Sequence, residues 1–182
     1  MALREDLQPT FAAGLNAQKR AVEGIETGDV LVIEARGIPD AGTIGDILAT
    51  RLHALGGVGI ITDGALRDTP AIAAIPMPTY HLSSHGSTYG RHHMPYSIDD
   101  AITCAGVFIV PGDVMVGDGE GVVVIPAHLV AEVTRDSLAQ EEVEAFALER
   151  VTAGESSIDV FPLADSRRGE FEAWCSANRE RN

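Results

Sequence analysis

Lysine is almost absent from this chain of 182 residues. Lys19 is the only lysine, and it stands beside Arg20 in a polar stretch that we expect to form an exposed helix. Imine and pyridoxal chemistry need a lysine that is desolvated in a cleft. The sequence therefore disfavours covalent catalysis through lysine.

Long apolar runs, basic clusters and closely spaced cysteines are missing as well. No apolar run has membrane-spanning length, and the amino terminus lacks the apolar segment of a signal peptide. A formal net charge of −14 without a Lys/Arg cluster argues against binding to a phosphate backbone. Cys104 and Cys175 lie far apart and suit reduced thiols. We expect a cytoplasmic protein with no nucleic-acid partner and no membrane partner.

The apolar pattern predicts a mixed α/β fold. A helix over 43–55 between strands at 30–34 and 58–62 forms a βαβ unit, which implies parallel strands and a right-handed crossover. From residue 80 onward the pattern is β-rich and partly antiparallel, and Asp118-Gly119 between β-branched runs predicts a hairpin. The remaining expected elements are helices at 16–25, 70–75 and 127–151, a helical tail, and strands at 80–83, 107–110, 114–116 and 122–125.

An adjacent cation and anion, Arg67 and Asp68, follow the apolar strand and the glycine turn of Ile60–Asp68. A guanidinium can hold a carboxylate through two parallel hydrogen bonds, and a carboxylate offers hard oxygen atoms to a divalent cation. Open α/β sheets usually bind their ligands just beyond the carboxyl ends of the strands. A surface ion pair that closes a turn is the alternative.

The start of the helix over 43–55 is a second candidate. Free backbone N–H groups at a helix start, with Gly45 permitting close approach, can bind a carboxylate. Asp46 could instead simply stabilise the positive end of the helix dipole. Because Gly45 begins the helix and Arg67 follows the next strand, both should lie at the same edge of the sheet. This proximity favours a site for a small anion.

Two further segments have open or structural interpretations. The glycine-rich run 111–126 lacks the residues of a phosphate loop or a calcium loop, so a structural hairpin is favoured. Four histidines, with two tyrosines and an arginine, crowd residues 81–96. A metal site, a solvated loop and a specificity loop over a binding site all remain possible there.

Taken in order, four motifs resemble those of the RraA-like family, which includes metal-dependent 4-hydroxy-4-methyl-2-oxoglutarate aldolases and the regulator of ribonuclease E activity. The motifs are GDIL at 45–48, TDGALRD at 62–68, GVFIVPGD at 106–113 and DGEGVVVIP at 118–126. The resemblance covers roughly Arg4 to Val151. It implies a single swivelling β/β/α-type domain, assembly as a homotrimer or a hexamer, and sites at subunit interfaces.

The resemblance also implies roles for individual residues. Gly45 to Leu48 match the substrate loop, in which the amides of Ile47 and Leu48 would hold a substrate carboxylate. Arg67 matches the catalytic arginine that contacts the pyruvyl group. Asp68 matches the ligand of Mg²⁺ or Mn²⁺, and Asp46 matches a catalytic acidic position for proton transfer through water.

The function expected from these features is that of a divalent-metal-dependent lyase, an aldolase or decarboxylase of class II type. Its substrates would be small 2-oxo acids, cleaved by retro-aldol reaction or by decarboxylation of oxaloacetate, each through the enolate of pyruvate. A non-catalytic regulator that binds a ribonuclease or helicase, or a degenerate family member, is the alternative. Asp46 favours the enzyme, because regulator-type members do not generally keep an acid there.

Two departures from the family pattern affect these expectations. Family members usually carry several tens of residues before the position that matches Arg4, and we expect this amino-terminal part of the domain to be missing here. The loop 83–97 is also unusual, so the substrate of the family cannot be assumed. We expect a family domain over residues 1–155 and a helical tail over 156–182.

Overall fold

The computed structural model describes residues 6, 7, 9 and 14–179. The chain divides into two compact units, Met1–Pro126 and Ala127–Asn182, which are described separately. The expected boundary after residue 155 concerns the extent of the family domain and stays a prediction. Arg4, where the resemblance begins, lies outside the described residues.

The first unit contains short helices and strands in alternation. Its helices are α2 (Ala17–Glu23), α3 (Asp46–Ala54), α4 (Thr69–Ile72) and the 3-10 helix η1 (Tyr89–Arg91). Its strands are β1 (Val30–Ile33), β2 (Gly59–Thr62), β3 (Ala65–Leu66), β4 (Thr79–Tyr80), β5 (Ser83–Ser84), β6 (Ile102–Cys104), β7 (Val107–Ile109), β8 (Val114–Gly117) and β9 (Val122–Ile125). The mixed α/β class is therefore confirmed.

The predicted βαβ unit is present. Strands β1 and β2 pair in parallel, with Val30 opposite Gly59 and Ile33 opposite Thr62, and α3 connects them. Strand β4 pairs in parallel with the other side of β2. Residues that follow the carboxyl ends of these strands therefore emerge at one edge of the sheet.

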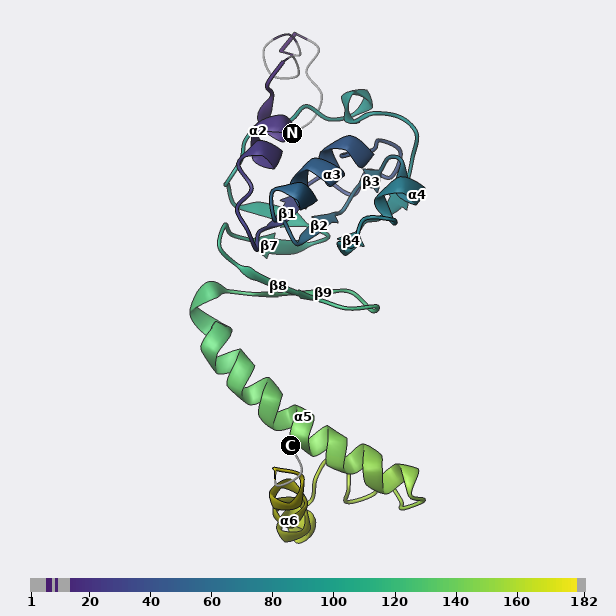
Figure 1. Cartoon of the computed structure of the whole chain (residues 1–182), viewed down its shortest axis with the longest axis vertical. Coiled ribbons are helices and arrows are strands. Elements are labelled where there is room, and N and C mark those ends of the chain that lie inside the picture. The colour runs from purple at the N-terminus through teal and green to yellow at the C-terminus, as the bar shows by residue number, and fades with distance from the viewer. Residues whose placement is uncertain (1–5, 8, 10–13, 180–182) are drawn as a thin grey trace. The chain divides into compact units, whose positions relative to one another are not determined.

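Helices α2, α3 and α4 lie on one side of the β1–β2–β4 sheet (Figure 1). Val22 of α2, Leu52 of α3 and Ile60 of β2 are completely buried and belong to one apolar cluster. Ile44, Leu66 and Ile72 belong to the same cluster. This packing fixes the start of α3 and the end of β3, the two places where the sequence predicts a site.

The second half of the first unit is built from antiparallel pairs. Strand β6 pairs with β7, and β8 pairs with β9 from Val114 opposite Ile125 to Gly117 opposite Val122. The predicted hairpin at 111–126 is therefore confirmed. Large apolar side chains on these strands remain exposed: Val107, Phe108, Val114, Val116 and Val123.

The second unit is helical. It contains η2 (Ala127–Leu129), the long helix α5 (Val130–Thr152), η3 (Asp165–Arg167) and α6 (Arg168–Arg179). Phe146 of α5 is completely buried, and it meets Phe171 and Trp174 of α6 edge to face. The predicted long helix and helical tail are both present.

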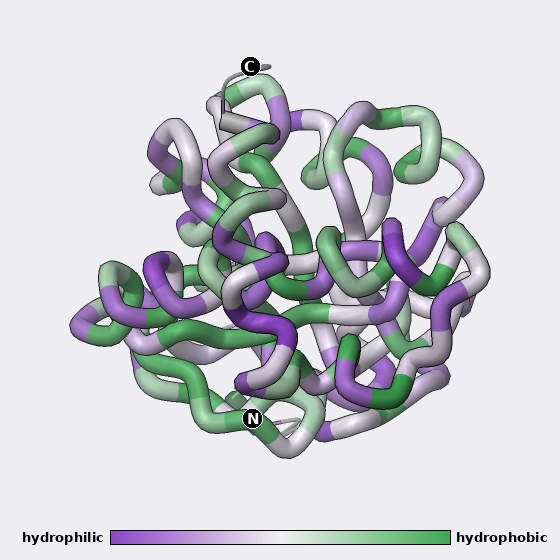
Figure 2. The backbone as a smooth tube through the Cα atoms, turned by 90° about the horizontal axis from the view of Figure 1, so that it is seen from below, coloured by the Kyte–Doolittle hydropathy of each residue, from purple (hydrophilic) through white to green (hydrophobic). Residues whose placement is uncertain are grey.

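Apolar stretches along the chain are short and are interrupted by polar residues (Figure 2). Within the described part of the chain, no helix combines the length and the apolar character needed to cross a bilayer.

Candidate functional site

The Arg67–Asp68 turn emerges directly from the buried strand β3. The backbone amide of Arg67 donates to the carbonyl of Ile44 at 3.0 Å, which ties the turn to the segment before α3. The amide of Thr43 donates to the carbonyl of Ala65 at 2.7 Å and joins the same two segments. The turn and the start of α3 are thus held together through backbone hydrogen bonds.

Gly45 lies against the side chains of this turn. A Cβ atom on Gly45 would be 2.8 Å from Oδ2 of Asp68 and 3.1 Å from Nη2 of Arg67. The backbone of Gly45 is extended (φ −118°), so it is space and not conformation that demands glycine here. The predicted proximity of the helix start and the Arg67–Asp68 turn is confirmed.

Arg67 and Asp68 also form an ion pair, with Nε of Arg67 3.1 Å from Oδ2 of Asp68. The two side chains are 37% and 38% exposed, and an ion pair at such a site contributes at most about 1 kcal/mol to stability. Both groups therefore stay accessible to a ligand, and stabilising the turn is a weak explanation for them.

Asp68 adopts a left-handed backbone conformation (φ 59°, ψ 35°) at the residue before α4. This conformation costs a non-glycine residue on the order of 1 kcal/mol. An aspartate at this position commonly caps the helix through its side chain, but Asp68 makes no such capping bond. The carboxylate lies beside Gly45 instead, with Oδ2 2.8 Å from the place that a Cβ of Gly45 would occupy.

The carboxylate of Asp68 fits a magnesium-type ion better than a zinc-type ion. Among the described residues, no three His, Cys, Asp or Glu side chains are grouped as a multidentate metal site would require. Mg²⁺ commonly binds through one or two carboxylates and completes its coordination with water and substrate. A partly exposed carboxylate beside a guanidinium suits that pattern.

The first turn of α3 presents Asp46, Ile47 and Leu48. The amide of Ile47 donates to Oδ1 of Asp46 at 2.8 Å, so this carboxylate already caps one of the amides expected to hold substrate. Ile47 is 77% exposed, which leaves the surface around the helix start open. A substrate carboxylate would have to replace Asp46 at the Ile47 amide, whereupon Asp46 is free to act elsewhere.

A pocket of about 260 Å³ adjoins the turn. It is lined on one side by the end of β3 and the start of α4, and on the other by the residues from Ser84 to Gly86. His85 is therefore the one histidine of the 81–96 loop that lines the pocket of Arg67 and Asp68. Among the described residues, no three His, Cys, Asp or Glu side chains of this loop are grouped as a metal site would require.

Other histidines of the loop have structural partners. Nε2 of His92 lies 3.0 Å from the carboxylate of Asp40, and Nη2 of Arg91 lies 3.2 Å from it. The hydrogen bond from His92 is the main reason that the pKa of Asp40 lies below its usual value. His93 is buried, and burial together with the Arg36 charge lowers its pKa, so it is neutral at pH 7.

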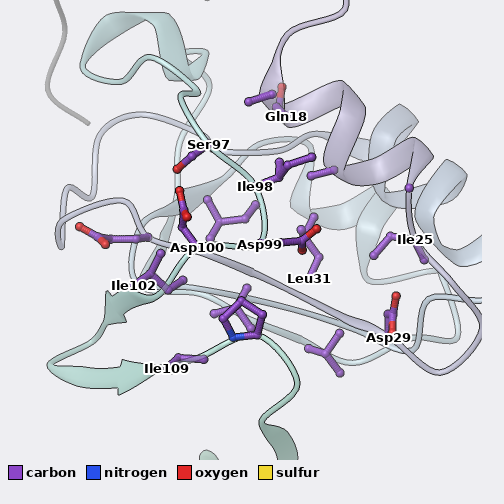
Figure 3. Close-up of a pocket in the computed structure, with 18 of the residues that line it drawn as sticks. Gln18, Ile25, Asp29, Leu31, Ser97, Ile98, Asp99, Asp100, Ile102 and Ile109 are labelled. Atoms are coloured by element: carbon purple, nitrogen blue, oxygen red, sulfur yellow. The ribbon is translucent and has the colours of Figure 1, made fainter.

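A larger cavity of about 700 Å³ lies elsewhere in the first unit. Gln18 of α2, Leu31 of β1 and the segment around Asp99 line it (Figure 3). It contains none of the residues that the sequence marks as catalytic, substrate-binding or metal-binding. The pocket at Arg67 is smaller, and of the candidate residues Arg67 and Asp68 line it, whereas Gly45 to Leu48 do not.

The sequence-based prediction did not identify two residues of this site, Gly42 and His85. A Cβ on Gly42 would be 2.9 Å from Cβ of Arg67, so Gly42 lets the backbone before α3 pass close beside the turn. The sequence pattern places His85 only in a loop whose function stays open. The glycine directly before the Thr43 segment was a usable signal for Gly42, whereas the position of His85 depends on strand β5, which the sequence pattern does not reveal.

Fold and geometry together define the class of the protein. It is a mixed α/β protein in which a guanidinium, a carboxylate and a helix start converge beyond the carboxyl ends of parallel strands. Such an arrangement can hold a small anion beside a hard cation.

The model of a protein family described as "RraA-like: Aldolase/RraA" matches residues 10–124 of the chain. The chain belongs to the RraA-like family. The matched range contains every candidate residue named above and lies within the first compact unit.

Individual relatives agree with this assignment. A protein of Halalkalibacterium halodurans named "Putative 4-hydroxy-4-methyl-2-oxoglutarate aldolase" is 37% identical over 121 residues, 63% of this chain and 55% of that relative. A Pseudomonas fluorescens protein of the same name is 32% identical over 61% of this chain and 68% of its own length. The chain thus spans little more than half of the first relative.

Solved structures give the same fold. The structure titled Streptomyces coelicolor RraAS2, "an unusual member of the RNase ES inhibitor RraA protein family", superposes with a TM-score of 0.74 at 30% identity. The superposition covers 82% of this chain and 73% of that one. The family thus includes relatives named as aldolases and relatives named as ribonuclease inhibitors.

Proposed function

We propose that the protein is a divalent-metal-dependent lyase that cleaves small 2-oxo acids at the Arg67–Asp68 turn. The observation that carries the proposal is the convergence of Gly45, Arg67 and Asp68, with no room for a side chain at Gly45. The names of the aldolase relatives support the lyase class. The substrates are 4-hydroxy-4-methyl-2-oxoglutarate, oxaloacetate or both.

Each residue has a distinct role in this proposal. Arg67 binds the carboxylate and keto end of the substrate, and the first-turn amides of Ile47 and Leu48 hold its carboxylate oxygens. Asp68 would hold Mg²⁺ or Mn²⁺, and the bound ion would supply several kcal/mol of charge stabilisation at the 2-keto oxygen. Gly45 keeps the two side chains close to the helix start.

The chemistry follows from these positions. In retro-aldol cleavage the 4-hydroxyl loses its proton and C4 becomes a carbonyl carbon as the C3–C4 bond breaks. The electron pair of the C3–C4 bond forms the enolate of pyruvate. Asp46 accepts the proton through a water molecule once substrate has replaced it at the Ile47 amide. In oxaloacetate no proton is removed: the C3–C4 bond breaks, C4 leaves as CO₂, and the electron pair of the bond forms the same enolate. In both reactions the enolate then takes up a proton at C3 to give pyruvate. The Arg67 guanidinium stabilises the negative charge that develops on oxygen.

A non-catalytic role as a ribonuclease regulator is the second candidate. It is favoured by the similarity to the Streptomyces coelicolor protein, which is named as a member of a ribonuclease inhibitor family, and by the net charge of −14. The Asp46 carboxylate within the first turn of α3 favours the enzyme. Turnover distinguishes the two candidates directly.

The assembly expected from the resemblance, a homotrimer or a hexamer, also belongs to the proposal. The exposed apolar side chains of the antiparallel strands, with Phe108 66% and Val123 63% exposed, are suited to burial between copies. Light scattering coupled to size exclusion measures the assembly. A monomer at micromolar concentration would contradict it.

The function is tested by pyruvate release from oxaloacetate and from 4-hydroxy-4-methyl-2-oxoglutarate, coupled to lactate dehydrogenase. Wild type with Mg²⁺ should release pyruvate above the metal-only rate, and chelator or Arg67→Ala should abolish the excess. No turnover of either substrate by correctly assembled protein would exclude the lyase. Turnover that survives both chelation and Arg67→Ala would show that the site is elsewhere.

A further inference from the structure

We infer that His85 determines substrate specificity at the Arg67–Asp68 site by donating a hydrogen bond from Nε2 to a second carboxylate, so that the site prefers dicarboxylic 2-oxo acids. The inference deepens the proposed function and rests on it. Three features of the described residues carry it: the strand register, the hydrogen bond at Nδ1, and the lining of the pocket.

The register of the parallel pair β3–β5 places His85 beside Arg67. Ala65 pairs with Ser83 and Leu66 with Ser84, so the next positions along the two strands are Arg67 and His85. The amide of His85 donates to the carbonyl of Leu66 at 3.0 Å, which continues the ladder to this point. Side chains at matched positions of neighbouring strands leave the sheet on the same face, about 5 Å apart.

The ring of His85 is held in one tautomer. The amide of Ser87 donates to Nδ1 at 3.1 Å, so Nδ1 carries the lone pair and the proton of the neutral ring is on Nε2. Within residues 14–179 and the few described before them, Nε2 has no hydrogen-bond partner. His85 therefore offers a fixed N–H donor at the pocket.

The pocket that Arg67 lines also carries other polar side chains. Besides His85, the hydroxyl-bearing residues Thr69 and Ser84 line it, and no lysine or second arginine does. An alkyl group placed beside His85 would leave its Nε2–H donor without a partner when the substrate is bound, which costs binding free energy. A carboxylate at the far end of the substrate would accept from Nε2 of His85. A volume of about 260 Å³ accommodates a small dicarboxylate.

The test measures binding of two 2-oxo acids that lack a leaving group, in the presence of Mg²⁺. 2-Oxoglutarate carries the second carboxylate and 2-oxobutyrate does not. Calorimetry should give wild type a preference of about tenfold or more for 2-oxoglutarate, the usual value of a hydrogen bond to a charged group. His85→Ala should remove the preference and leave the affinity for 2-oxobutyrate unchanged.

Two conservative variants separate the donor from the bulk of the ring. The amide nitrogen of Gln can occupy the place of Nε2, whereas that of Asn reaches only the place of Nδ1. His85→Gln should keep the preference for 2-oxoglutarate, and His85→Asn should lose it. These two variants test the role of Nε2 even if His85→Ala does not fold. Equal affinities in wild type, no binding of either acid, or a preference that persists in His85→Asn would overturn the inference.

Because the assay needs no turnover, its outcome is independent of pyruvate release. A protein that releases no pyruvate but prefers 2-oxoglutarate through His85 would refute only the lyase. A protein that cleaves its substrates but binds both acids equally would refute only the role of His85.

Discussion

Replacing Gly45 with alanine should abolish most activity while leaving the fold intact. A Cβ at this position would lie 2.8 Å from Oδ2 of Asp68, whereas ordinary contact begins at 3.4 Å. The carboxylate must therefore move by about 0.6 Å, the difference between these two distances, and the Arg67 guanidinium at 3.1 Å must move with it. Both side chains are more than a third exposed and can shift without disturbing the core.

The magnitudes follow from that displacement. A misplacement on the order of 1 Å can reduce turnover about 100-fold, so Gly45→Ala should reduce kcat by about tenfold to 100-fold. The backbone of Gly45 is extended and admits alanine, and alanine in place of glycine at a helix N-cap costs about 0.5–1 kcal/mol of stability. The unfolding midpoint should therefore change little.

The assay is pyruvate release at saturating Mg²⁺, measured beside chemical denaturation of the same preparation. Gly90→Ala is the matched control, because its nearest contact would be the Thr88 hydroxyl at 3.8 Å. The control should keep wild-type kcat. Wild-type kcat in a folded Gly45→Ala variant would refute the reasoning, because the close approach of Gly45 would then be irrelevant to catalysis.

Three further predictions concern strain, a buried thiol and a buried imidazole. Asp68→Gly should lose pyruvate release yet unfold at the same or higher denaturant concentration, because glycine adopts the left-handed conformation of Asp68 without strain; a marked loss of stability would contradict the strain argument. Burial and the charge of Asp63 raise the pKa of Cys104 to about 11, so a thiol reagent at pH 8 should modify Cys175 quickly and Cys104 only after denaturation; equal rates in the native protein would contradict this. Folding lowers the pKa of His93, so its contribution to stability is complete above pH 6.5 and is lost as the pH falls below that value. The free energy of unfolding, measured by chemical denaturation between pH 5 and pH 8, should therefore fall with falling pH in wild type but not in His93→Gln. The same pH dependence in both proteins would contradict this prediction.

The central βαβ unit could be predicted because its elements are long enough to show a period. The spacing of Ile44, Leu48 and Leu52 is helical, and two apolar strands flank that helix. This connectivity predicts that the start of α3 and the segment after β2 lie near one another. The structure inserts strand β3, which pairs with β5 in a separate sheet, between β2 and Arg67. The proximity of Gly45 to both side chains confirms that the start of α3 and the turn lie close together.

The short strands could not be predicted in the same way. Strands β3 and β5 have two residues each, and β6 has three, so neither alternation nor an apolar run marks them. The pairing of β3 with β5 depends on the packed unit and not on local sequence. The place of His85 beside Arg67 follows from that pairing, so it was invisible at the level of sequence.

The sequence pattern also could not predict local conformations that depend on tertiary contacts. The left-handed backbone of Asp68 is unusual for a residue other than glycine, and nothing in TDGALRD requires it. The tautomer of His85 depends on a hydrogen bond from the Ser87 amide. Both features arise from how the loops close around the sheet.

The most direct test of the lyase at this turn is a Mg²⁺ titration of pyruvate release from oxaloacetate, with the metal-only rate subtracted at each concentration. Wild type should rise from background to saturation, and Asp68→Asn, which keeps the shape of the side chain but loses its charge, should stay near background. Full wild-type turnover in chelator, or the same Mg²⁺ dependence in Asp68→Asn, would contradict the account.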